Sequence, residues 1–71
     1  MIRKGTIRSF DSVAYTATIQ IEGSEGVWIH DMPVSRGIAA GEMTTGRKVA
    51  VVFFDESNPR DAVVAAVYTP H

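Results

Sequence analysis

Apolar and polar side chains alternate along residues 13–22, with a period of two. The apolar side chains hold the odd positions, and four of the five residues between them are Thr, Gln or Glu. Successive side chains of a β-strand point to opposite faces, so this pattern predicts a strand with one buried face. The positions assigned to the buried face are Val13, Tyr15, Ala17, Ile19 and Ile21.

Four further segments have the composition of short strands and are bounded by turn-forming residues. They span residues 3–10, 27–32, 47–54 and 62–68, with a hairpin loop at 23–26 and a polar turn at 55–61. Gly5 within the first segment suggests a bulge or a tight bend. Pro33 ends the segment 27–32 or places this segment at a sheet edge. Residues 34–45 carry no long apolar stripe, so we expect a loop there with room for one helical turn.

The chain has 71 residues, which leaves room for one domain around a single core. Five short strands without a helix are typical of a small antiparallel barrel or sandwich. We therefore predict an all-β fold, a small five-stranded antiparallel OB-like barrel that takes in the whole chain, residues 1–71.

Segments 47–54 and 62–68 are apolar on both faces, whereas a one-layer barrel normally has a polar outer face. The surplus apolar face needs a cover, and a second copy of the chain is the economical candidate. Two alternatives stay open, because the loop 34–45 could fold over this face or the small Ala and Val side chains could simply tolerate exposure. The pattern does not say which face points inward, so the opposite alternating set is also open. The favoured subunit-interface residues are Val52, Phe54, Val64, Ala66, Tyr68 and Trp28.

The composition narrows the possible partners. The formal net charge is −1, from 7 basic and 8 acidic residues, so the chain has no excess positive field for phosphates. It contains no cysteine and only two histidines, so we expect no disulfide, metal or other cofactor. With those sources of stability set aside, self-association remains for a domain of this size. No apolar run is long enough for a membrane span or a signal peptide, so we expect synthesis in the cytoplasm.

His30 and Asp31 are the one adjacent pair that invites an acid–base interpretation. Neighbours on a strand point to opposite faces, so a surface histidine beside a strand-ending aspartate is the simpler interpretation. The serines lie in turn contexts, and the acidic residues within 55–61 lack the ligand spacing of a calcium loop. We therefore predict no catalytic, cofactor-binding or metal-binding residue and no enzymatic activity.

A nucleic-acid-binding module is the alternative function. OB barrels bind single strands by stacking bases on aromatic side chains in a basic groove on the second and third strands. Here the exposed residues Thr16, Thr18 and Gln20 have no ring and no cation. On the next strand, Trp28 and His30 are the rings available for stacking. The basic residues at positions 3, 4, 8, 47 and 48 are interpreted as solvated rims of the barrel. Both observations argue against nucleic acid as a partner.

A set of short motifs, spread over nearly the whole chain, carries a family resemblance. The motifs are Gly5-Thr6-Ile7 with Asp11, residues 15–21, Val27-Trp28-Ile29, residues 46–54 and residues 58–64. This pattern resembles the OB-fold domain of the phage baseplate assembly protein V and type VI secretion spike family. The resemblance implies a trimeric, non-catalytic component of a contractile tail or phage-like particle. Family members usually continue into a needle-like spike, so for this sequence we expect a hub, adaptor or decorating subunit instead.

Overall fold

The computed structural model describes residues 1–23, 26–55 and 57–70, which form five strands and one short helical turn. The middle of the predicted hairpin loop, residues 24–25, and one position of the polar turn, residue 56, lie outside the described residues. The elements are β1 (Ile2–Asp11), β2 (Thr16–Ile21), β3 (Trp28–Pro33), the 3-10 turn η1 (Ala40–Glu42), β4 (Lys48–Phe53) and β5 (Ala62–Tyr68).

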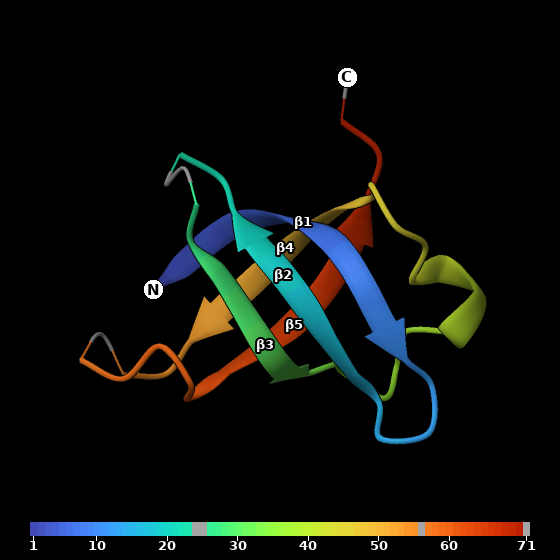
Figure 1. Ribbon diagram of the computed structural model, residues 1–71, viewed down its shortest axis with the longest axis horizontal. Helices are drawn as coiled ribbons and strands as arrows, with labels where there is room; N and C mark the ends of the chain where they lie inside the picture. The colour runs from blue at the N-terminus through green and yellow to red at the C-terminus, as the bar shows by residue number, and fades with distance from the viewer. Residues whose placement is uncertain (24–25, 56, 71) are drawn as a thin grey trace.

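The strands form a single curled sheet in the order β3-β2-β1-β4-β5, and every neighbouring pair is antiparallel. In Figure 1, β3, β2 and β1 lie nearer the viewer, and β4 and β5 cross behind them. The two edges meet at one parallel bridge between Val34 and Val64, where the Ser35 amide donates to the Val64 carbonyl at 2.9 Å. The fold is therefore the predicted all-β, five-stranded, OB-like arrangement, with a sheet that is not fully closed.

The inside of the curl is apolar, because each strand sends alternate side chains inward. No polar or charged side chain is buried among the described residues. The loop between β3 and β4 adds Val34 and Met43 to the interior, while its Ile38 packs against the core from outside. The buried hydrophobic residues are Ile7, Ala17, Ile19, Ile21, Met32, Val34, Met43, Val49, Val51, Phe53, Ala62 and Val64.

Three register shifts bend the strands around this core. Arg8 is the extra residue of β1 opposite β2, because Ile7 pairs with Ile19 and Ser9 with Thr18. In β3, residues 30 and 31 together face Thr18, and Asp31 takes a left-handed φ of 56°. Ala65 is the extra residue of β5. Bulges increase the local twist and re-aim the side chains beside them.

The prediction that the second strand begins at Val13 is wrong. Asp11 Oδ1 accepts hydrogen bonds from the amides of Val13 (2.9 Å) and Ala14 (3.2 Å), and Tyr15 has a φ of 57°. This side-chain-to-backbone bonding holds residues 12–15 in a turn. Val13 is consequently 92% exposed, although the alternation assigned it to the buried face.

Gly5 marks a close approach of strands instead of the suggested bulge. It pairs in regular register with Ile21 of β2 and Val49 of β4, and the shift in β1 comes at Arg8. A Cβ atom added at Gly5 would lie 2.5 Å from Ile19 Cγ2 and 3.2 Å from the Gln20 carbonyl oxygen. Only glycine allows β1 to pass between its two neighbours at this distance.

We therefore expect Gly5→Ala to lower the free energy of unfolding by about 1–3 kcal/mol, because the added methyl group overpacks the core. Urea denaturation followed by circular dichroism measures this change. Gly41→Ala is the matched control, because a Cβ there meets nothing within 4 Å. Equal denaturation midpoints for the two variants would show that the strands have room for a side chain at position 5.

Candidate interaction surfaces

The outside of the barrel divides into two faces of different chemistry, and β1 belongs to both. Cross-strand partners in a sheet share a face, so the strand register traces one outward row around the whole barrel. This row begins on the β5 side and ends on the β3 side, and it consists of Tyr68, Lys48, Thr6, Gln20 and Trp28.

The outer face of β1, β4 and β5 is the apolar face. Its first row holds three aliphatic side chains, Ile2, Val52 and Val63, which pair across the three strands. The next row consists of Lys4, Ala50 and Ala66. Phe54, directly after β4, is 67% exposed, and Ile2 is 71% exposed. The loop 34–45 therefore does not cover these side chains, and the alternative in which it shields them is not what the structure shows.

The structure sorts the predicted interface residues into three groups. Val52, Ala66 and Tyr68 lie on the apolar face by register, and exposed Phe54 follows it. Val64 is 0% exposed and packs in the core, so its assignment to a subunit contact is wrong. The reason is the bulge at Ala65, which puts Val64 and Ala66 on opposite faces although they are two residues apart.

Trp28, the last predicted interface residue, lies on the other outer face, formed by β1, β2 and β3, which we call the polar face. It pairs with Gln20 and is 47% exposed. Arg8 reaches across from β1, and its guanidinium carbon lies 5.2 Å from the centre of the indole ring. Gln20 Oε1 accepts a hydrogen bond from Arg8 Nε at 2.7 Å, so a neutral partner holds the guanidinium in place.

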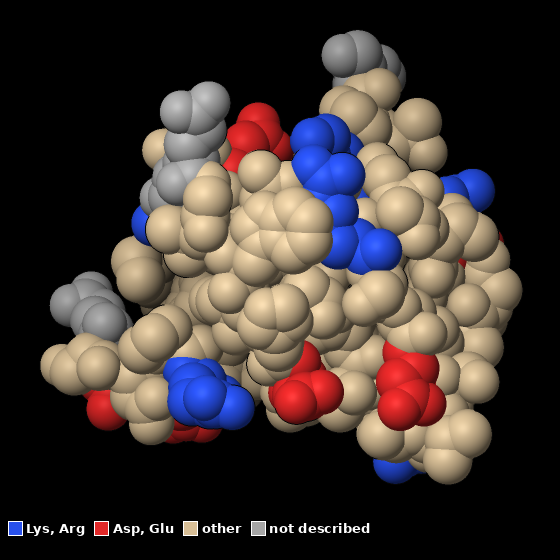
Figure 2. Space-filling view, in the orientation of Figure 1, with Lys and Arg blue, Asp and Glu red and all other residues tan. Residues whose placement is uncertain are grey.

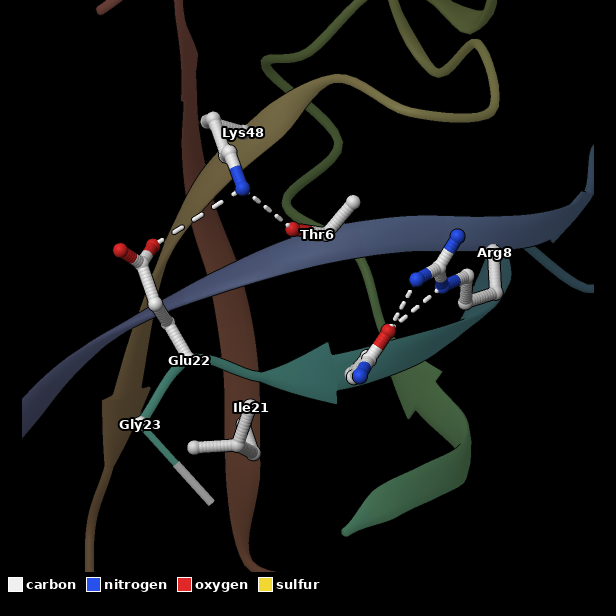
Figure 3. Close-up of a pocket in the computed structure, with 7 residues that line it drawn as sticks. Thr6, Arg8, Ile21, Glu22, Gly23 and Lys48 are labelled. Carbon is white, nitrogen blue, oxygen red and sulfur yellow. Dashed lines mark hydrogen bonds and ion pairs between the residues drawn. The ribbon is translucent and has the colours of Figure 1, made fainter. Parts of the chain in front are cut away.

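Two hollows lie on the polar face. The Lys48 hollow, about 510 Å³, is lined by Thr6, Arg8, Gln20, Ile21, Glu22, Gly23 and Lys48. In Figure 3, Lys48 points between Thr6 and Glu22, and Arg8 lies apart from them, where its Nε bonds to Gln20 Oε1. The Arg60 hollow, about 230 Å³, is lined by Trp28, Ile29, His30, Pro59 and Arg60. Figure 2 shows one cluster of Lys and Arg side chains in the upper middle of this view, with an acidic group beside it, and both basic and acidic side chains along the lower edge.

The Lys48 ammonium has two contacts in its hollow. Its Nζ atom donates to Thr6 Oγ1 at 2.8 Å and lies 4.0 Å from Glu22 Oε2. The carboxylate is half exposed, so this long ion pair is weak and leaves most of the positive charge available.

Two of the side chains considered for catalysis or metal binding, His30 and Asp55, have local partners. His30 Nδ1 lies 3.2 Å from Thr18 Oγ1 on the neighbouring strand. Asp55 Oδ1 accepts from the Ser57 amide at 2.9 Å and thereby fixes its own turn. Within residues 1–23, 26–55 and 57–70, no three His, Asp or Glu side chains come together as a metal cluster.

Two surface residues were not recognised from the sequence. Ile2 extends the apolar face, but it was not assigned to any strand. Arg8 was interpreted as a rim residue, because a regular alternation gives no sign of the bulge that lays it over Trp28. Only the alternation of Thr6 and Arg8 with apolar Ile7 hinted that β1 had an exposed side here.

Comparison of the chain with models of known families, with curated proteins and with solved structures gave no significant match. Among the described residues, no helix has the length and apolar character needed to cross a membrane.

The Arg8–Trp28 contact predicts a spectroscopic effect. We expect Arg8→Met to change the emission of Trp28, the one tryptophan in the chain, because a charged group leaves its ring. The accompanying loss of stability should stay at or below about 1 kcal/mol, as for an exposed cation–π pair. Arg36→Met is the control, because the Arg36 guanidinium lies over Tyr15 instead. Identical emission spectra for wild type and Arg8→Met would contradict the contact.

Proposed function

We propose that this protein is a non-catalytic structural subunit that associates with copies of itself through the apolar face. The observation that carries the proposal is the row Ile2, Val52 and Val63, with exposed Phe54 nearby. A sheet face of this composition on the outside of a small barrel is typical of an interaction surface.

The strand register supports a second copy as the occupant. The small side chains of Ala50 and Ala66 lie side by side in the second row and let another backbone approach closely. Lys4 is the one charged side chain of these two rows, and it lies on β1 at their margin. An apolar centre with charge at its edge is the usual anatomy of a protein interface.

The proposed copy number is three, and the proposed setting is a phage tail, baseplate or related phage-like particle. Both rest on the family resemblance described above, which implies a trimeric component of a contractile tail. In such a particle the protein would act as a hub, an adaptor or a decorating subunit. A cyclic trimer uses a heterologous contact, so the apolar face of one copy would meet a different surface of the next, one that leaves the polar face of that next copy uncovered.

Light scattering after size-exclusion chromatography tests the proposal. At micromolar concentration we expect light scattering to give the wild type a molar mass three times the chain mass of 7.7 kDa. Ala66→Glu should shift the protein toward the monomer, because it buries an unpaired charge at the contact. Ala66 is exposed within one subunit, so the fold itself tolerates the substitution.

Ser9→Glu is the matched control. Ser9 is an exposed β1 residue that pairs with Thr18 on the polar face. The substitution Ser9→Glu therefore adds the same charge as Ala66→Glu, but away from the proposed contact. A wild type that elutes as a monomer would refute self-association. An equal effect of both substitutions would mean that the apolar face is not the contact.

A further inference from the structure

Trp28 lines one hollow of the polar face, and Arg8, whose guanidinium lies over the Trp28 ring, lines a second one. Arg8 lines the Lys48 hollow and Arg60 lines the Arg60 hollow. The indole ring is nearly half exposed and faces outward, because it shares its row with Gln20. The polar face therefore carries an exposed aromatic ring with Arg8 over it and Arg60 in the hollow that the ring lines.

Neither arginine is neutralised by a described carboxylate. The ion pairs of the described residues are Arg47 with Glu42 and Lys48 with Glu22. Arg8 is bound by the neutral amide of Gln20, so its charge persists. The hydrogen bonds of the turn, in which the Arg60 amide donates to Asn58 Oδ1 at 3.1 Å, fix the backbone at Arg60. Both guanidinium groups are thus available to an anionic ligand, with Arg8 held at its side chain by Gln20 and Arg60 anchored at its backbone.

We propose that the polar face binds short single-stranded nucleic acid, with a base stacked on the face of the Trp28 ring that Arg8 does not cover and with phosphates at Arg8 and Arg60. Stacking on an aromatic ring beside cations that follow the backbone is the general mode of sequence-tolerant single-strand binding. Guanidinium groups suit phosphate because their planar donors match its oxygens. The Arg60 hollow, which Trp28 lines, and the Lys48 hollow, which Arg8 lines, leave space for the nucleotides next to the stacked one.

The charge pattern favours a nucleic acid over a neutral glycan. A neutral sugar would use the ring and the polar groups but would leave both guanidinium charges without a partner. The net charge of the chain is only −1, and three cations, Arg8, Lys48 and Arg60, line the two hollows. From the sequence alone, nucleic acid is not expected as a partner, because Arg8 is interpreted as a residue of the barrel rim.

Fluorescence anisotropy of a labelled oligothymidylate of about 12 nucleotides, within the usual site sizes of an OB fold, tests the proposal. We expect binding at low salt that weakens as salt is raised, with quenching of Trp28. Trp28→Ala should weaken binding roughly 5- to 150-fold through lost stacking. Arg8→Gln and Arg60→Gln keep the ring, and each should reduce the salt slope by about 1.

Arg36→Gln is the control of equal charge, because Arg36 lines neither hollow and lies over Tyr15. No anisotropy change at the lowest salt would overturn the proposal. It would also be overturned by salt-independent binding, by displacement with a neutral oligosaccharide, or by an equal loss with Arg36→Gln. Because the polar face is separate from the apolar face, the oligomeric state of the protein does not decide this result.

Discussion

The structure depends on one geometric constraint, the curling of a single five-stranded sheet until its own inner face forms the core. β1 lies at the centre of the sheet and pairs with both β2 and β4, so it must bend more than a regular strand. Gly5 permits the close approach to Ile19, and the extra residue Arg8 increases the twist three positions later. The same bend divides the outside of the barrel into two faces, so the core and the interaction surfaces have a common origin.

The irregularities of the strands determine what those faces offer. The bulge in β1 lays Arg8 over Trp28, and the bulge in β5 separates buried Val64 from exposed Ala66. In β3, the extra residue allows His30 to reach Thr18 while Met32 still points into the core. At each bulge the core residues still point inward. The side chains that point outward differ from those that a regular strand would present. Surface chemistry in this small protein is therefore a property of backbone register as much as of residue type.

Much of the fold could be predicted from the sequence, because a period of two in apolar residues is dictated by the backbone of a strand. The last strand was predicted with its observed bounds, Ala62–Tyr68, and the irregular stretch 34–45 contains only one 3-10 turn. The start of β2 was predicted wrongly, because Asp11 bonds to the amides of Val13 and Ala14 and this local bonding overrides the alternation. The positions of Arg8 and Val64 could not be predicted, because a bulge is fixed by three-dimensional pairing and leaves no periodic signal.

The two outer faces lie on either side of β1, and occupation of one leaves the other uncovered. Copies joined through the apolar face would each still present Trp28 to the solvent. Several identical weak sites on one particle raise the effective concentration of a ligand that can reach more than one of them, and overall avidity then exceeds that of any single site. With the proposed single-strand binding, a particle built from these barrels would hold a long, flexible chain through repeated sites, without a deep groove in any one copy.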